Sequence, residues 1–197
     1  MQGKENRGTA LRRAATEVAY EQGLAGLTLA NVAQAAQMPL GSLYYYFKTR
    51  DDVVEAVVQG LEERMVEWVA RLDALPGPGA ALKGFARAVL GNADRLSQFG
   101  CPIGTLTAQL RKQPGEPGRR VGDILAGMAI WAQARFRDLG ADADRARAEG
   151  RLLLVTLEGA AMMAHASGDP TFVDDTVAAI DARIDSFTDT LDQRRPS

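Results

Sequence analysis

The sequence predicts an all-α protein, and three observations lead to this fold class. Apolar residues recur in steps of three and four along most of the chain, which is the spacing of one buried helix face. No stretch carries the alternation with a period of two that indicates a half-buried strand. Clusters rich in Pro and Gly, at 76–79 and 168–170, separate the apolar segments and are typical helix ends.

The first predicted helix covers residues 12–23. Leu11, Ala15 and Val18 share one face of it, and Gly23 is its stop signal. We expect this helix to support the segment that follows.

Residues 28–50 predict two short helices joined by a tight turn. Thr28 is suited to an N-cap, and the helix after it has an apolar stripe of Leu29, Val32, Ala33 and Ala36. Gln37 and Met38 carry the turn. Pro39 stands where a second helix of about two turns begins, a position that tolerates a fixed φ. This pattern is a helix-turn-helix, whose second helix enters the major groove of DNA.

The same stretch, over roughly residues 8 to 60, resembles the N-terminal domain of TetR-family transcriptional regulators. The matching positions are Thr28, Val32, Ala33, Ala36, Gly41, Ser42, Leu43, Tyr44 and Phe47. The resemblance implies a DNA-binding regulator with a C-terminal helical domain that binds a small-molecule effector and joins a second copy. It implies operator contacts by Thr28, Pro39, Leu40, Gly41, Ser42, Tyr44, Tyr45, Lys48 and Arg50.

Three residues depart from the family's pattern. Gln37 replaces the usual turn Gly, so that either the turn has no positive φ or Gln adopts one. Pro39 replaces a Ser or Thr cap. Leu40 replaces a polar or basic residue, and it can contact a thymine methyl group but cannot hydrogen-bond a base. Because residues 22–47 contain no charge, phosphate neutralisation is expected from Arg7, Arg12, Arg13, Lys48 and Arg50.

Simpler interpretations of these residues stay open. Tyr44, Tyr45 and Tyr46 can be packing residues, and Tyr46 lies nearest the seam with the preceding helix. Lys48 can be a solvated surface charge, as most lysines are.

The charge distribution favours a sequence-specific DNA-binding protein. Residues 1–50 hold six Lys or Arg against three Asp or Glu, whereas residues 51–197 hold seventeen against twenty-two. A basic head faces phosphates and an acidic body avoids them. We therefore expect a helix-turn-helix DNA-binding domain at 1–50 and a helical ligand-binding and dimerisation domain at 51–197.

Several classes of protein are disfavoured. The N-terminal residues lack the apolar core of a secretory signal, and no run of 18 apolar residues predicts a membrane span. The single cysteine, Cys101, excludes an intramolecular disulfide and a multi-cysteine metal site. We expect a cytoplasmic protein with no metal, no cofactor and no membrane partner.

The rest of the chain predicts six further helices, for about nine in all. They cover residues 52–75, 80–96, 102–111, 121–139, 142–167 and 171–192, and a loop rich in Pro and Gly is expected at 113–118.

The last two predicted helices carry apolar stripes typical of helix–helix contacts. In the resembling family such a pair joins its mate in a four-helix dimer interface, which here implies Leu152, Val155, Gly159, Val177, Ile180, Ile184 and Phe187. The alternative is that both stripes are core within one chain. We prefer a twofold dimer, because a lone recognition helix reads too few base pairs.

The resemblance also implies an effector cavity among the middle helices. The candidate lining residues are Phe85, Phe99, Leu106, Met128, Trp131, Met162, Met163 and His165, a mixture that suits an apolar or aromatic ligand. Each of them can instead be ordinary core, and His165 can be an exposed residue.

Cys101 precedes a predicted helix in a Gly-Cys-Pro segment like one found in a subset of the family, where a cysteine responds to oxidants or electrophiles. A helix N-terminus favours a thiolate, which makes a redox role physically sensible. The commoner role of a lone cysteine is that of a small buried apolar residue.

An enzyme is disfavoured. One His and one Cys cannot form a metal centre of several nitrogen or sulfur ligands, and no Gly-rich phosphate loop or nucleophile elbow is present. A helical adaptor that has lost DNA binding is the third hypothesis, motivated by Pro39 and Leu40. Tyr44, Lys48 and Arg50 argue against it. The sequence therefore predicts a homodimeric, effector-responsive regulator, and a repressor in preference to an activator.

Overall fold

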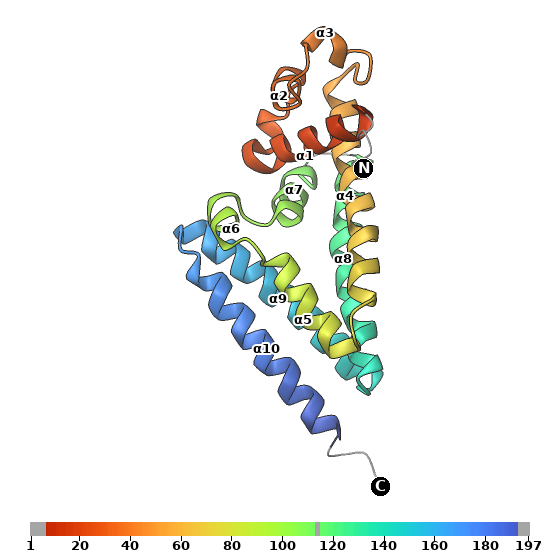
Figure 1. Ribbon diagram of the computed structural model, residues 1–197, viewed down its shortest axis with the longest axis vertical. Coiled ribbons are helices and arrows are strands. Elements are labelled where there is room, and N and C mark those ends of the chain that lie inside the picture. The colour runs from red at the N-terminus through yellow and green to blue at the C-terminus, as the bar shows by residue number, and fades with distance from the viewer. Residues whose placement is uncertain (1–6, 113–114, 193–197) are drawn as a thin grey trace, which may run out of the picture. The chain divides into compact units, whose positions relative to one another are not determined.

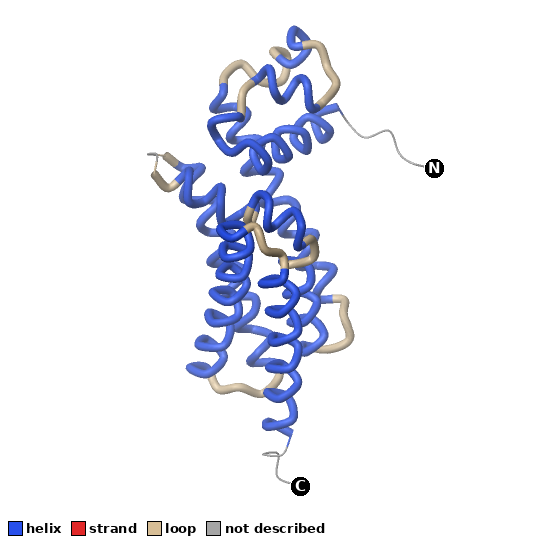
Figure 2. Tube along the Cα trace, turned by 90° about the vertical axis from the view of Figure 1, so that its left-hand side faces the viewer, coloured by secondary structure: helices blue, strands red, loops and turns tan. Residues whose placement is uncertain are grey.

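The computed structural model describes residues 7–112 and 115–192, with side chains up to Thr190. Every regular element in this part of the chain is a helix, and loops and turns join the helices (Figure 2). The all-α prediction is confirmed. Figure 1 labels the helices, which are α1 (Arg7–Gly26), α2 (Leu29–Ala35), α3 (Leu40–Leu43), α4 (Arg50–Asp73), α5 (Pro78–Val89), α6 (Ala93–Phe99), α7 (Pro102–Leu110), α8 (Glu116–Asp138), α9 (Ala143–Ser167) and α10 (Thr171–Asp192).

The helices form two compact units. The first holds residues 7–66 and 102–124, and the second holds residues 67–101 and 125–192, within the described parts of the chain. The compact units therefore do not divide at residue 50, the boundary expected from the sequence. Instead α4 and α8 each contribute residues to both units.

In the first unit, α1 is interrupted at Gly23 as the sequence predicts. Gly23 has a φ of 65°, in the left-handed region where glycine carries no Cβ penalty. Beyond this interruption the backbone N–H of Leu24 donates to Oε1 of Gln109, on α7, at 2.8 Å. The long-range bond satisfies a donor that the interruption leaves without a helical partner.

The start of α4 is fixed by a reciprocal capping box. The backbone N–H of Asp52 donates to Oγ1 of Thr49 at 3.2 Å, and the N–H of Thr49 donates to Oδ2 of Asp52 at 2.9 Å. Lys48 N–H donates to the same carboxylate at 2.7 Å. The backbone donors of Thr49 and Lys48 hold the pKa of the Asp52 carboxyl below its ordinary value. These bonds set the direction of α4 directly after the helix-turn-helix.

In the second unit, the segment 80–96 forms α5 and α6 and not the single helix expected. The chain turns at Gly91, where a Cβ would lie 2.5 Å from the carbonyl oxygen of Arg87. Asn92 then caps α6, since its side chain accepts from the N–H of Arg95 at 3.0 Å. Helical spacing of apolar residues continues across the turn, so periodicity alone did not reveal it.

Two helices, α5 and α9, pack against α10 in this unit (Figure 1). Ion pairs fix the orientation of α10, because Lys83 and Arg87 of α5 pair with Asp185 and Asp181. On the other flank Arg183 pairs with Glu149 of α9 at 2.7 Å. The face between these flanks is apolar and buried, and it consists of Val173, Ile180, Ile184 and Phe187.

Candidate nucleic-acid interface

The helix-turn-helix lies at residues 28–47 of the first unit, as predicted. Thr28 is the N-cap of α2, with Oγ1 accepting from the N–H of Asn31 at 3.1 Å. Val32 and Ala33 of α2 are buried, as are Leu43 and Phe47 of the recognition segment. These four side chains hold α2 and α3 together, which leaves the opposite side of α3 free.

The turn between the helices is made by Gln37 in a left-handed conformation with φ of 53°. Of the two possibilities in the sequence, Gln37 therefore accepts the strain that glycine usually avoids. Pro39 is the N-cap residue of α3 and offers no side-chain cap. The helix itself covers only residues 40–43, which is shorter than the two turns expected, because residues 44–46 continue as a turn.

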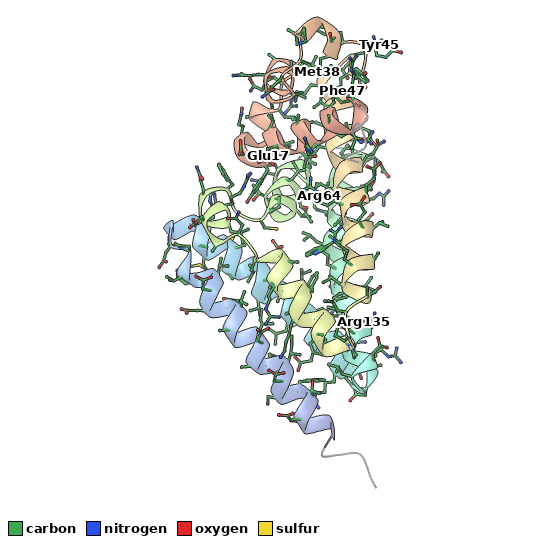
Figure 3. All side chains as sticks on the ribbon, viewed as in Figure 1. Glu17, Met38, Tyr45, Phe47, Arg64 and Arg135 are labelled. Atoms are coloured by element: carbon green, nitrogen blue, oxygen red, sulfur yellow. The ribbon has the colours of Figure 1, made fainter. Side chains whose placement is uncertain are left out.

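All nine residues implied to contact an operator are exposed. The large hydrophobic residues among them are Leu40, Tyr44 and Tyr45, with 41%, 47% and 81% of their surface exposed. Figure 3 shows Tyr45 projecting outward from the turn after α3. Tyr46 is also exposed, and its ring meets the ring of Tyr45 edge to face with centroids 5.2 Å apart. Large side chains with this exposure are not required for the core of the unit.

The two cations that follow the recognition segment have different partners. Lys48 is exposed and its Nζ donates to the carbonyl oxygen of Tyr44 at 2.6 Å. The guanidinium of Arg50 donates to the carbonyl oxygen of Leu24, at the end of α1. Arg50 therefore ties α4 to α1, a structural contact that the sequence did not reveal.

A second surface is the outer face of α9, in the other unit. Leu152, Val155 and Gly159, which are expected at the interface, are exposed, and so are Ala148, Met162 and Ala166 on the same stripe of this helix. Val155 and Met162 leave 67% and 72% of their surface uncovered. A row of exposed apolar side chains on one helix face is typical of a protein–protein contact.

The apolar stripe of α10 differs, and the expected interface needs a correction. Ile180, Ile184 and Phe187 are buried within the chain, and Val177 is half-buried. The ring of Phe187 packs on Phe136 with centroids 5.1 Å apart. For these residues of α10 the core interpretation applies, because α5 and α9 already cover this face.

The expected effector residues belong to both units. Leu106 is buried in the first unit, and Phe85 and Met128 are buried in the second. Met162, Met163 and His165 lie on the exposed side of α9, which for His165 is the alternative that the sequence left open. Small residues and leucines occupy the buried side of that helix, namely Ala146, Gly150, Leu153, Leu157, Ala160, Ala161 and Ala164.

An aromatic cluster brings two of the expected effector residues together. The ring of Phe85 lies between Trp131 and Trp68, with centroid distances of 5.2 and 5.4 Å. Both tryptophans are half-buried, and Nε1 of Trp131 donates to Oδ1 of Asp73 at 2.9 Å. Trp68 lies in the helix expected at residues 52–75, and it is not among the effector residues expected from the sequence.

Of the remaining expected effector residues, Phe99 and His165 have polar contacts near α6. Arg95 lies over the ring of Phe99, and Nδ1 of His165 is 3.2 Å from the carbonyl oxygen of Ser97.

The single cysteine has a specific partner. Cys101 is buried, and its thiol donates to Oε1 of Glu158, on α9, at 3.1 Å. Burial raises the pKa of the Glu158 carboxyl above its ordinary value. The sequence did not identify Glu158, since it lies 57 positions from Cys101.

Of the helices in the described part of the chain, none has both the length and the apolar character needed to cross a membrane.

Two family models match the chain. Residues 11–57 match the model described as bacterial regulatory proteins of the tetR family. Residues 78–193 match the model described as the C-terminal domain of LmrA/YxaF-like transcriptional regulators. Together they cover both the helix-turn-helix and the surfaces on α9 and α10.

Solved structures of TetR-family regulators share the fold. A regulator from Legionella pneumophila has a TM-score of 0.81 at 16% identity, over 92% of this chain and 99% of that one. The regulatory protein TetR from Rhodobacter sphaeroides has a TM-score of 0.73 at 24% identity, over 88% and 96%. The reduced form of NemR from E. coli has a TM-score of 0.67 at 15% identity, over 89% and 95%. The chain belongs to the TetR family of transcriptional regulators, and it is a DNA-binding regulator with an N-terminal helix-turn-helix.

Proposed function

We propose that the protein is a homodimeric repressor that binds a palindromic double-stranded DNA operator and is released by a small apolar or aromatic effector. The observation that carries the proposal is the exposed recognition segment, where Leu40, Tyr44 and Tyr45 present large side chains that the unit does not bury. Side chains so placed on a helix-turn-helix are available to the major groove.

The exposed residues divide by chemistry into two roles. Leu40, Gly41, Ser42 and Tyr45 face base edges, whereas Thr28, Tyr44, Lys48 and Arg50 contact the DNA backbone through hydroxyl and cationic donors. Pro39 packs beside the backbone of the DNA. Thr28 can cap α2 and contact a phosphate at the same time, because its Oγ1 accepts from the N–H of Asn31 while its hydroxyl hydrogen remains free to donate.

A second copy of the chain is proposed to cover the outer face of α9. Gly159 lies in the middle of the exposed stripe, and a Cβ built there meets nothing within 4 Å. Glycine inside a helix is unfavourable by roughly 0.5–1 kcal/mol relative to alanine, and nothing within one chain requires it here. Close approach by a partner helix accounts for it. A twofold dimer places two recognition helices on half-sites about one helical turn apart.

The effector is proposed to bind beside the aromatic cluster of Trp68, Phe85 and Trp131. Flat apolar rings with one polar group nearby suit an aromatic ligand. Trp68 lies on α4, which begins at Arg50 directly after the recognition segment and is continuous to Asp73. A ligand that favours one position of α4 thereby changes the spacing of the recognition helices. It shifts the equilibrium between the two positions by the difference between its binding free energies for them.

A redox or electrophile sensor is the second candidate, supported by Cys101 and by the likeness to a NemR structure described as a reduced form. The contact of Cys101 argues for the effector-driven mechanism. Its thiol is buried and donates to a carboxylate, and negative charge beside a thiol disfavours the reactive thiolate.

The proposal is tested by gel shift with the purified protein and the DNA that flanks its gene, at two salt concentrations and against a scrambled competitor. We expect specific, salt-sensitive binding that Tyr44→Ala weakens without preventing dimerisation. Ile130→Ala is the matched control, because Ile130 is a similarly exposed apolar residue on α8. Absence of specific binding, both here and in a selection from random DNA, would favour the adaptor hypothesis.

A further inference from the structure

We propose that the protein recognises thymine methyl groups in its operator through Leu40, and that Gly41 allows the backbone of α3 to approach the base edges closely. The inference rests on the proposed operator binding and specifies which chemical feature of the DNA is recognised. It makes Leu40 a specificity-determining residue and Gly41 a positioning residue.

The chemistry of the recognition segment limits what it can recognise. Residues 22–47 contain no charged side chain, so the bidentate contact of Arg or Lys with guanine is absent from α2 and α3. Leu40 has no polar atom in its side chain, and 41% of its surface is exposed. The C5 methyl of thymine is the apolar group that the standard bases present in the major groove. Leu40 and thymine are therefore complementary.

Leu40 has exposed, uncharged neighbours on the recognition segment. Pro39 and Gly41 flank it and are exposed, and Tyr44 follows one helical turn later with 47% of its surface exposed. Single exposed apolar residues are ordinary on protein surfaces, whereas a contiguous group needs an explanation. The partner that covers this group is DNA, because the group forms the outer side of the recognition segment.

Gly41 supplies a second, independent observation. It lies inside α3 without a positive φ, so its backbone conformation does not require glycine. A Cβ built at Gly41 meets nothing within 4 Å, so packing within the chain does not require glycine either. A glycine without close neighbours leaves the backbone open to another molecule, and at Gly41 this opening lies on the recognition segment. Because Gly41 is adjacent to Leu40, we assign that molecule as the operator DNA, with a base edge close to the backbone of α3.

The test begins with an operator selected from random DNA by the purified protein. Each thymine of that operator is replaced in turn by deoxyuridine, which keeps the hydrogen-bonding groups and removes only the methyl. For the native protein we expect at least one position in each half-site where affinity falls about fourfold, the effect of returning one methyl to water. With Leu40→Ala, measured at lower salt to retain binding, the same replacements should change affinity by less than about 1.5-fold. Ile130→Ala should keep the native pattern.

Gly41→Ala tests the close approach. We expect affinity to fall at least about tenfold while the melting temperature stays equal or rises, because alanine is the better helix former. Gly127→Ala on α8 is the matched control, since Gly127 is equally exposed and open to a Cβ. It should gain the same thermal stability and leave the affinity unchanged.

Each contrary result has one meaning. Methyl-independent binding by the native protein, or methyl dependence retained in Leu40→Ala, would overturn the role of Leu40. Native affinity in Gly41→Ala would overturn the close approach. If no DNA is enriched from the random library, the operator-binding proposal itself fails, and this inference fails with it.

Discussion

Arg120 Nε donates to Oε1 of Glu62 at 2.9 Å, and the same guanidinium also reaches Glu55, two turns earlier on α4. The Arg120 side chain is mostly buried, with 21% exposed, and all three residues belong to the first unit. One residue of α8 therefore holds two turns of α4, the helix that begins beside the recognition segment.

Removing this contact should destabilise the protein. We expect Arg120→Ala to lower the free energy of unfolding by about 2 kcal/mol, between the values for exposed and fully buried pairs. Urea denaturation followed by circular dichroism measures it. Arg119→Ala is the control, because Arg119 is 58% exposed and pairs with Glu116 and Asp123 of its own helix. Equal losses in the two variants would contradict a special role for Arg120.

The same contact predicts a pH dependence. The hydrogen bond from Arg120 lowers the pKa of Glu62 below its ordinary value of 4.5. A carboxyl with a lowered folded-state pKa stabilises the fold above the ordinary pKa, and that stabilisation is lost as pH falls through the folded-state pKa. The difference in the free energy of unfolding between the native protein and Arg120→Ala should therefore be constant above about pH 5 and shrink below pH 4.5. A difference that stays constant down to pH 3 would show that the charge of Glu62 contributes nothing.

Lys48 should contribute to affinity without contributing to specificity. We expect Lys48→Ala to weaken binding to operator and to unrelated DNA by similar factors, and to reduce the slope of log affinity against log salt by about one. Titrations at four salt concentrations measure the slope. Arg71→Ala is the control, as Arg71 is an exposed cation near the end of α4. An unchanged slope in Lys48→Ala would leave Lys48 as a surface charge.

The outer face of α9 should determine the oligomeric state. We expect Val155→Arg to weaken dimerisation by about a hundredfold or more, because a charge would be buried without a partner in the proposed interface. Light scattering after size exclusion, at several concentrations, measures the mass. Ile130→Arg is the matched control, since Ile130 is 66% exposed and Val155 is 67% exposed. A dimer unaffected by Val155→Arg would move the interface elsewhere.

The helix-turn-helix could be predicted from the sequence because its determinants are local. Thr28 caps α2 by accepting from the N–H of Asn31, three residues later, and Gly23 interrupts α1. The positive φ of Gln37 was one of the two possibilities that the sequence left open. Each depends on residues within one or two turns. Spacing and capping chemistry therefore predict these features without information on tertiary contacts.

The stripes of α9 and α10 show where prediction stops. Both helices have apolar residues in steps of three and four, yet Val155 is exposed and Ile184 is buried. Periodicity indicates that a helix has an apolar face, but it does not indicate which molecule covers that face. Contacts such as Gln109 with Leu24, 85 positions apart, depend on the packing of distant segments and leave no local pattern.

The pair of Cys101 and Glu158 predicts a gain of stability on removing a charge. Burial raises the pKa of Glu158 above 4.5, so the ionised form is disfavoured in the folded protein. Glu158→Gln keeps an oxygen that can accept from the Cys101 thiol and removes the ionisation. We expect the variant to have a higher melting temperature than the native protein at pH 8, measured by thermal denaturation.

The pH dependence of stability that Glu158 causes is opposite to that of a carboxyl paired with a cation, such as Glu62. A group with a raised folded-state pKa binds its proton more tightly in the folded protein, so stability increases as pH falls through that pKa toward 4.5. The advantage of Glu158→Gln should therefore disappear below about pH 4.5. Glu67→Gln is the control, because Glu67 is 72% exposed, and its melting temperature should follow that of the native protein throughout. A Glu158→Gln variant that is less stable than the native protein at every pH would contradict this prediction, because it would mean that the hydrogen bond from the Cys101 thiol needs a charged acceptor.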